Sequence, residues 1–364
     1  MLITLDATPL LGTRTGIGRY TAHLVAQLPG ALARRGAEGA VRVTTWTARG
    51  GRLTDLPAGV RQVGPRVPAR VLRALWSRGD RPRVESLVGR TDVFHGTNFV
   101  SPPTRAAREV VTVHDLTYAL HASTVSADSL RYAELVPRAL RRGAHVLVPS
   151  DAVADAVREH YSLGADRVST TPLGVDPVWF EVAPPSATWL DDRALPHDYL
   201  VFVGSLDPRK NLRVLLEAHA RLRADDTDAP DLVLAGPAGR DTSLAGRPGV
   251  HLTGWLPDAD LRTLVAGARA LVLPSLDEGF GLPVVEALAA GRPVVTSRAP
   301  ALLEVGGRHA RTAPAEDADA LADALGAVLR DADDDASRRE RRAWAERFSW
   351  SRCADLTVDA YLAA

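Results

Sequence analysis

Short apolar runs recur along the chain, and each is followed by a turn and a helix-like pattern. They cover residues 2–5, 41–44, 93–94, 110–113, 146–148, 200–203, 232–234, 271–273 and 294–295. Strands that alternate with helices are typical of βαβ units and parallel sheets. Nine such strands are too many for one compact sheet in 364 residues. We therefore predict an α/β protein with two doubly wound domains.

Residues 172–200 contain five prolines and Gly174, a density of chain breakers that predicts an interdomain connection. The charge changes sign at the same place. Residues 1–175 hold 23 basic and 14 acidic side chains, whereas residues 176–364 hold 21 and 30. We predict an N-terminal domain over residues 1–175, a linker over 176–199 and a C-terminal domain over 200–345. The spacing of apolar residues predicts a packed terminal helix within residues 346–364.

Composition narrows the class of protein. The net charge of zero argues against a nucleic-acid partner, which would favour a bulk positive field. The single cysteine, Cys353, excludes a disulfide framework and a cysteine-based metal site. The first residues show no secretion signal, and no apolar run approaches the roughly 18 residues of a membrane span. We expect a cytoplasmic protein that is either soluble or peripherally attached to the inner face of the membrane.

The only lysine, Lys210, stands among 43 arginines. A high-GC genome favours arginine, so a lysine that remains marks a place where arginine does not serve. Asp207 suits a helix N-cap and Pro208 the first helical position, which places Arg209 and Lys210 in the first turn of a helix. The helix dipole disfavours cations there, and a bound phosphate or diphosphate would remove the conflict. The alternative is an ordinary surface lysine.

A second loop, residues 274–291, combines anion-binding amides with carboxylates. Pro283 and Gly291 frame a short helix, with Glu278 before it and Glu286 about one turn inside it. The amides of Phe280, Gly281 and Leu282 could hold phosphate. The carboxylates would repel phosphate, so we expect them to accept hydrogen bonds from hydroxyl groups. Both properties together suit a sugar nucleotide.

Two further loops follow predicted strands. Residues 12–20 contain Gly12, Gly16 and Gly18 and open into a helix, which indicates either close approach of a ligand or a tight turn. As a dinucleotide fingerprint this segment is weak, because Thr21 stands where the third glycine belongs. His114 and Asp115 form either a catalytic pair or a core histidine capped by its neighbour.

These motifs resemble one family. Glu278 and Glu286, with seven residues between them, resemble the E-x7-E motif of the retaining GT-B glycosyltransferases of family 4, also called group 1, and residues 208–211 resemble its diphosphate motif. Similar segments follow in the family's order at residues 15–20, 113–115, 172–176, 254–258 and 303–306. The resemblance implies two Rossmann-like domains facing across a cleft, with the donor held by the C-terminal one. It also implies that the last helix crosses back to the N-terminal domain.

The resemblance also implies roles for single residues. Lys210 and Arg209 would neutralise the departing diphosphate in place of a metal ion, Glu278 would lie by the transferred sugar, and His114 would line the sugar pocket. The donor would be bound by Gly16, Gly18, Gly204, Ser205, Gly254, Phe280, Gly281, Leu282 and Glu286, the last through the ribose. Acceptor contacts would fall to Arg19, Tyr20 and Asp115. Many relatives have arginine in place of Ser205, so the diphosphate charge here would rest on Arg209 and Lys210.

The implied reaction is transfer of a hexose from a nucleotide sugar to a hydroxyl of a glycan or lipid-linked acceptor. It retains the anomeric configuration and needs neither metal nor cofactor. The small residue Ser205, taken with the motifs at residues 16–20 and 208–211, resembles bacterial mannosyltransferases. This resemblance favours GDP-mannose over UDP-glucose or UDP-N-acetylglucosamine. The alternatives from other classes are a non-catalytic sugar-nucleotide sensor and a Rossmann oxidoreductase.

Seven arginines lie from Arg66 to Arg90, interleaved with apolar residues at helical spacing. A basic amphipathic helix of this kind can lie on an anionic membrane and bring the enzyme to a lipid-linked acceptor. The alternative is a helix that faces the core and exposes its arginines to solvent.

Overall fold

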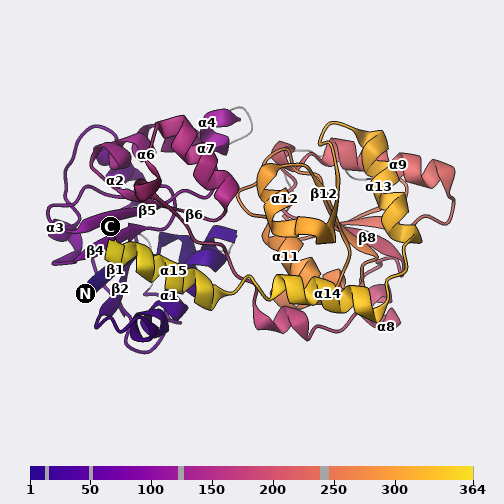
Figure 1. Cartoon of the computed structure of the whole chain (residues 1–364), viewed down its shortest axis with the longest axis horizontal. Coiled ribbons are helices and arrows are strands. Elements are labelled where there is room, and N and C mark those ends of the chain that lie inside the picture. Colours follow the sequence, from indigo (N-terminus) through magenta and orange to yellow (C-terminus); the bar gives the residue numbers. More distant parts are fainter. Residues whose placement is uncertain (13–15, 49–51, 122–126, 238–245, 364) are drawn as a thin grey trace. The chain divides into compact units, whose positions relative to one another are not determined.

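The computed structural model describes residues 1–12, 16–48, 52–121, 127–237 and 246–363. The chain forms two compact units (Figure 1). Unit 1 consists of residues 1–174 and 349–364, and unit 2 of residues 175–348. Residues 176–199, which the sequence predicts as a linker, belong to unit 2, where they form the short helices Pro177–Phe180 and α8 (Ala187–Asp191).

Unit 1 contains a seven-stranded parallel sheet with the order β3-β2-β1-β4-β5-β6-β7. The strands are β1 (Leu2–Asp6), β2 (Ala40–Thr44), β3 (Arg61–Gln62), β4 (Val93–Gly96), β5 (Arg108–Thr112), β6 (His145–Val148) and β7 (Val168–Thr170). The chain moves from β1 towards β3 and then restarts at β4 on the other side. The topological switch point therefore lies between β1 and β4.

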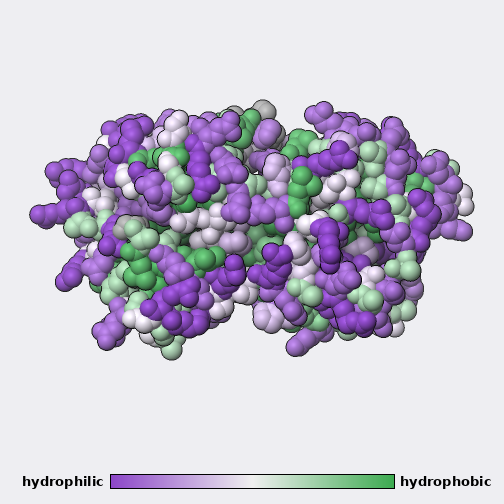
Figure 2. Space-filling view, in the orientation of Figure 1, coloured by the Kyte–Doolittle hydropathy of each residue, from purple (hydrophilic) through white to green (hydrophobic). Residues whose placement is uncertain are grey.

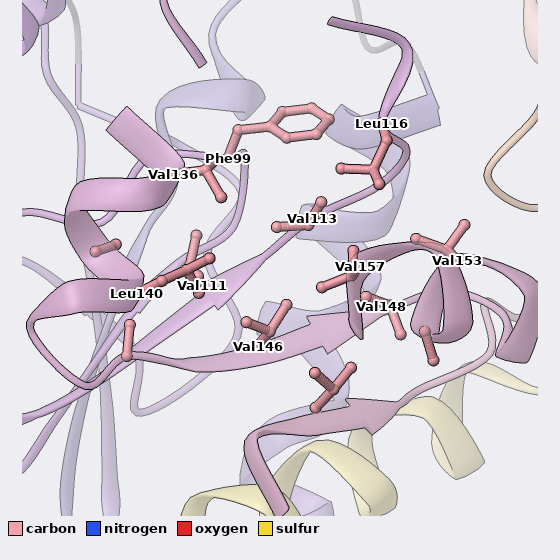
Figure 3. Packing of buried hydrophobic residues seen from close by; sticks show 14 of the residues in the cluster. Phe99, Val111, Val113, Leu116, Val136, Leu140, Val146, Val148, Val153 and Val157 are labelled. Atoms are coloured by element: carbon pink, nitrogen blue, oxygen red, sulfur yellow. The ribbon is translucent and has the colours of Figure 1, made fainter. Parts of the chain in front are cut away.

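Helices cover both faces of this sheet. Figure 1 shows α6 (Tyr132–Arg141) and α7 (Asp151–Tyr161) on one side, with α1 (Gly16–Arg34) and α15 (Trp350–Ala363) on the other. In Figure 3, valines of β5 and β6 point toward apolar side chains of α6 and α7. Four shorter helices complete the unit: α2 (Ala69–Trp76), α3 (Glu85–Val88), α4 (Thr117–Leu120) and α5 (Ala127–Leu130).

The last helix is an integral part of unit 1. Helix α15 packs along α1, and Arg34 binds Asp355 at 2.8 Å while Arg35 binds Asp359 at 2.5 Å. The buried His95 of β4 contacts the Tyr361 hydroxyl at 2.6 Å through Nδ1. The C-terminal residues therefore close the face of a sheet that begins at residue 2.

Unit 2 contains a six-stranded parallel sheet with the order β10-β9-β8-β11-β12-β13. Its strands are β8 (Tyr199–Val203), β9 (Asp231–Ala235), β10 (Val250–Gly254), β11 (Ala270–Leu273), β12 (Val294–Ser297) and β13 (Ala310–Ala313). Its longer helices are α9 (Leu212–Asp225), α10 (Asp258–Gly267), α11 (Leu282–Ala289), α12 (Pro300–Gly306), α13 (Ala318–Arg330) and α14 (Asp335–Ala345). The switch point lies between β8 and β11. The predicted pair of doubly wound parallel sheets is confirmed.

The structure also bears on the membrane question. In the described residues, no helix is both long enough and apolar enough to cross a bilayer.

Candidate active site

The two loops that the sequence singles out in unit 2 lie at the switch point of its sheet. Residues 204–211 follow β8, and residues 274–281 follow β11. These strands are neighbours, with Leu200 opposite Ala270 and Val201 opposite Leu271. Ligands of open α/β sheets bind at the carboxyl ends of strands beside such a point. Two segments about 70 residues apart in sequence are thus brought to one place.

The first loop is held by close backbone packing. The Gly204 amide donates to the Ala235 carbonyl at 3.0 Å. Gly236, directly after β9, has a φ of +152°, and a Cβ there would lie 1.9 Å from the Gly204 carbonyl oxygen. The Gly236 amide in turn donates to the Gly254 carbonyl at 3.0 Å. Gly204 and Gly254, both predicted to bind the donor, are therefore linked through Gly236.

Asp207 and Pro208 begin a helical turn as predicted, but the prediction that this turn continues into the following helix is wrong. Arg209 and Lys210 lie in a separate 3-10 turn, Pro208–Lys210, and α9 begins only at Leu212. Asn211 breaks the helix because it adopts a left-handed conformation with φ 58°. Its side chain donates to the carbonyls of Pro274 at 3.1 Å and Ala315 at 2.5 Å, which stabilises this conformation. Arg209 and Lys210 therefore do not lie in the first turn of α9, and the predicted conflict with the dipole of that helix does not arise.

A buried carboxylate holds both cations instead. The Lys210 Nζ lies 2.5 Å from Glu278 Oε1, and Arg209 donates to Glu278 Oε2 at 3.1 Å. The Ser275 hydroxyl donates to Oε1 at 2.7 Å. The side chains of Lys210 and Glu278 are only 12% and 8% exposed. Burial alone would raise the pKa of Glu278, but the Lys210 and Arg209 charges and these hydrogen bonds bring it to about 2.

This cluster has a net charge of +1 and unused hydrogen-bonding capacity. A carboxylate offers about four lone-pair directions, and the three hydrogen bonds above leave one on Oε2 within the described part of the chain. The Lys210 ammonium uses one of its three N–H groups on Glu278. The arrangement can therefore receive an anion on Lys210 and a hydroxyl on Glu278 side by side.

The second loop leads into α11 as the sequence predicts. Pro283 is in the first turn of the helix, and Gly291, with φ 76°, follows its end. Glu286 is 2% exposed and lies about one turn inside α11. Gly281 precedes the helix with φ 98°, a conformation that glycine adopts without strain. The amides of Phe280, Gly281 and Leu282 thus lie where the chain enters the helix.

Two other predicted donor residues differ in burial. Phe280 is 4% exposed, and its ring lies edge-on to Phe348 with the centroids 5.6 Å apart. The Phe280 side chain is thus part of the core, so only its backbone could reach a ligand. Ser205 is half-buried in the loop after β8. Its short side chain adds no charge beside Arg209 and Lys210.

Ionised Glu278 leads to a prediction about acid. Because the pKa of Glu278 is lower in the folded chain than in the unfolded one, its contribution to stability is complete above the unfolded value near 4.3 and is lost as the pH falls towards about 2. The contribution is on the order of 3 kcal/mol. Urea unfolding of the wild type and of Glu278→Gln should show a weaker pH dependence for the variant in this range. Equal acid sensitivity of the two proteins would contradict the ion-pair cluster.

His114 lies at the carboxyl end of β5 in unit 1. Its Nε2 donates to the Thr97 carbonyl at 2.8 Å, since a carbonyl can only accept, and its ring packs edge-on against Tyr20 and Phe99. Burial lowers the pKa of His114, which favours the neutral ring. The neutral ring then has an unprotonated Nδ1 that can accept a hydrogen bond. Asp115 accepts from the Thr117 amide at 3.0 Å and so caps the start of α4.

The remaining predicted residues of unit 1 lie at the start of α1. Gly16 is exposed and Gly18 is buried, both within the first turn, and residues 13–15 of this motif lie outside the described residues. Arg19 is half-buried. Tyr20 is fully buried, and its hydroxyl binds Thr112 Oγ1 at 2.9 Å. With no exposed surface, the Tyr20 side chain packs α1 onto the sheet. Its contact with the acceptor stays a prediction.

Polar residues that the sequence motifs do not include also lie at both switch points. In unit 2 these are Ser275 and Asn211, described above. In unit 1, Asp6 is the last residue of β1, and Asn98 lies two residues after β4. Both line a cavity of about 20 Å³ together with Trp46, Arg73 and Trp76. Burial raises the pKa of Asp6, although it accepts a hydrogen bond from the Thr8 amide at 2.9 Å. Asp6 and Asn98 could have been predicted from the sequence, because polar residues at or just after the end of an apolar strand lie where ligands bind.

Comparison with known proteins gives the family. The model described as "Glycosyltransferase Family 4" matches residues 15–179, and that described as "Glycosyl transferases group 1" matches residues 197–331. The O-antigen chain mannosyltransferase B of Escherichia coli is 32% identical over 74% of this chain and 74% of its own length. The MMP alpha-(1->4)-mannosyltransferase of Mycolicibacterium hassiacum is 34% identical over 63% of this chain and 56% of its own length.

Solved structures agree on the fold. Sucrose-phosphate synthase from Thermosynechococcus elongatus has a TM-score of 0.72 at 20% identity, and the match covers 99% of this chain and 98% of that one. The two matched family models and the relative that is 32% identical confirm the predicted resemblance. The chain belongs to glycosyltransferase family 4 and has the two Rossmann-like domains of a GT-B glycosyltransferase.

Proposed function

We propose that this glycosyltransferase transfers mannose from GDP-mannose to a hydroxyl of a glycan or lipid-linked acceptor, with retention of configuration and without a metal ion. The observation that carries the proposal is the cluster of Lys210, Arg209 and Glu278 at the switch point of unit 2. The two mannosyltransferases reported above support mannose as the sugar. The lipid-linked or glycan acceptor follows from the family alone.

In the proposed reaction the bond between the sugar C1 and the diphosphate oxygen breaks, and the acceptor oxygen bonds to C1 on the same face. The acceptor proton passes to the departing diphosphate. Negative charge grows on that diphosphate in the transition state, where the Lys210 ammonium and the Arg209 guanidinium stabilise it. Side-chain cations thus take the part that a metal ion would otherwise have.

The carboxylates and the histidine would orient the substrates. Glu278 has one remaining acceptor direction for a sugar hydroxyl, and Glu286 would accept from the ribose. His114 would accept a hydrogen bond from a sugar hydroxyl through its unprotonated Nδ1. Gly16 and Gly18 would allow the backbone at the start of α1 to come close to the substrates. Arg19 remains the proposed acceptor contact on α1.

The donor is tested by ligand-induced stabilisation. At a concentration about a hundred times its Kd, GDP-mannose should stabilise the protein by about 2.7 kcal/mol and raise the Tm, whereas UDP-glucose, UDP-N-acetylglucosamine and ADP-glucose should give smaller shifts. Differential scanning fluorimetry with all four donors measures this. A larger shift in Tm with a UDP-sugar would contradict GDP-mannose and identify that UDP-sugar as the donor.

Turnover separates an enzyme from a sugar-nucleotide sensor. Incubation with GDP-mannose and a mannose-terminated acceptor should release GDP, and NMR of the product should show the anomeric configuration of the donor. Binding without release of GDP in the presence of a range of acceptors would favour the sensor. A product of opposite configuration would exclude the retaining mechanism.

We further propose that unit 1 contacts anionic membranes through α2. Leu72 and Trp76 of α2 are buried in the core, which fits the core-facing alternative, but Val71 and Leu75 are 43% and 46% exposed. They lie four residues apart on one face, beside the basic residues Arg70 and Arg78. This combination of apolar and basic side chains suits the surface of an anionic bilayer.

Vesicle binding tests this contact. The wild type should co-sediment with phosphatidylglycerol vesicles at low salt, and Val71→Ser/Leu75→Ser should bind less. A matched control is Leu120→Ser/Leu130→Ser, which changes two other exposed leucines of unit 1. Equal loss in both double variants, or no binding of the wild type at low salt, would exclude α2 as the contact.

A further inference from the structure

Five arginines gather where α14 packs on the end of α11 in unit 2: Arg292, Arg338, Arg339, Arg341 and Arg342. Four of them line a cavity of about 370 Å³, which we call the arginine pocket: Arg292, Arg338, Arg339 and Arg342. Asp335 also lines it, and its apolar wall consists of Val182, Pro184, Ala266 and Ala290. Hydrophilic side chains cover much of the surface over α14 (Figure 2).

The arginine pocket is separate from the cluster around Lys210. Ala290 of the pocket follows the last residue of α11, whereas Gly281 and the second active-site loop precede its first residue. An eight-residue helix is about 12 Å long. The pocket and the proposed donor site therefore lie at opposite ends of α11.

The local charges are not balanced. Asp333 is shared by three arginines: Arg338 donates to it at 3.0 Å, Arg292 lies 3.7 Å from it, and Arg341 also binds it. Asp335 lies 3.7 Å from Arg338. Five guanidinium groups thus face these two carboxylates, which leaves a local excess of positive charge.

Neighbouring acids do not remove this excess. Asp331 pairs with Arg311, and Glu340 lies 3.8 Å from Arg308. The Asp334 carboxylate accepts from the Ser337 amide at 2.8 Å as the cap of α14. Asp331 and Glu340 thus have cationic partners outside the pocket. Asp334 has none among the described residues, and its charge acts on Arg339, so the local excess is two positive charges.

Burial makes the imbalance significant. The side chains of Arg292 and Arg341 are only 17% and 11% exposed, so water screens them poorly. The Nε atoms of Arg292 and Arg342 are buried and have no hydrogen-bond partner among the described residues. Burial, followed by the charges of Arg338, Arg341 and Arg342, lowers the pKa of Arg292, although Asp333 opposes this. A buried donor without an acceptor is unfavourable, and an anion would supply acceptors.

We propose that the arginine pocket binds a phosphate group, carried either by a soluble molecule or by a lipid headgroup. A phosphate offers several strong acceptor oxygens and up to two negative charges, which match converging guanidinium groups and an excess of two positive charges. The cavity of about 370 Å³ has room for an attached group, which Val182 and Pro184 would contact. A neutral sugar or a cation would leave the charge excess in place.

Calorimetric titration with pyrophosphate tests the pocket against the donor site. The wild type should bind two pyrophosphates, one in each site. Arg338→Gln/Arg342→Gln, which removes charge but keeps polar side chains, should bind one, or bind the second about tenfold more weakly. Lys210→Ala should keep the pocket and lose the other site. The control, Arg213→Gln/Arg221→Gln, removes the same charge from α9 and should bind as the wild type does.

Vesicles distinguish the two sources of phosphate. The vesicle test uses the Val71→Ser/Leu75→Ser background, in which α2 no longer contributes. If the source is a lipid, this protein should bind phosphatidylcholine vesicles that contain phosphatidic acid, and adding Arg338→Gln/Arg342→Gln should remove that binding. If the source is soluble, only the pyrophosphate titration should respond to the arginine variant. A folded Arg338→Gln/Arg342→Gln protein that binds pyrophosphate like the wild type, and in this background binds vesicles like its parent, would overturn the proposal. A Lys210→Ala protein that binds pyrophosphate like the wild type would contradict the proposed donor site and leave the arginine pocket unaffected.

Discussion

Lys210→Ala is expected to lower the kcat of sugar transfer about a hundredfold. Loss of one charged contact to a transition state that develops negative charge removes on the order of 3 kcal/mol of stabilisation. The variant should remain folded, because Glu278 keeps Arg209 and Ser275 as partners. Steady-state release of GDP measures the effect. More than about a tenth of the wild-type rate would exclude Lys210 from charge stabilisation.

Lys210→Arg is the sharper version of the same experiment. The only lysine among 43 arginines is 12% exposed, and its ammonium lies 2.5 Å from Glu278. A guanidinium is larger and planar, so it cannot place its charge at the same point between Glu278 and an anion. We expect only partial recovery of the rate lost in Lys210→Ala. Full wild-type activity would mean that the lysine is an accident of sequence composition.

Gly236→Ala is expected to destabilise unit 2 by about 3 kcal/mol. A Cβ at this position would lie 1.9 Å from the carbonyl oxygen of Gly204 and 2.7 Å from its carbon. Both are backbone atoms and cannot rotate away, so the loop that precedes Arg209 and Lys210 has to move. The affinity for the donor should fall with the stability.

Gly246→Ala is a matched control for this substitution. Gly246 also has a positive φ, of 80°, but a Cβ there meets nothing within 4 Å. Backbone strain is present in both variants, and the clash only in Gly236→Ala. Calorimetric melting of both proteins measures the difference. Equal melting temperatures would show that the loop at Gly204 accommodates a methyl group.

The strands that the sequence predicts are the nine interior strands of the two sheets. The four that it misses, β3, β7, β10 and β13, are the outermost strand at each edge. Interior strands of a parallel sheet are covered on both faces and form apolar runs. The missed strands contain exposed or polar residues, such as Arg61 in β3 and Arg311 in β13. Apolar periodicity therefore gives the architecture and the switch points, but not the edges.

The candidate site could be predicted only in part, for a similar reason. Local patterns placed Arg209, Lys210 and Glu278 in two loops after strands, and the parallel topology brings these loops together. The ion pair itself joins residues 68 positions apart, and no local pattern contains it. The helix-like spacing around Lys210 was misleading, because the conformation of Asn211 depends on carbonyls of Pro274 and Ala315. Tyr20 shows the converse, a motif residue that tertiary packing buries.

Unit 1 is interrupted in the sequence by the whole of unit 2. Its sheet is complete at residue 170, but α15, which packs along α1, is made only from the last residues of the chain. During synthesis, unit 2 has all its residues before unit 1 does. The packing of α1 against α15 therefore forms only after the whole of unit 2 has been synthesised. A chain that stops before residue 349 would lack α15 and would expose the face of α1 that α15 covers.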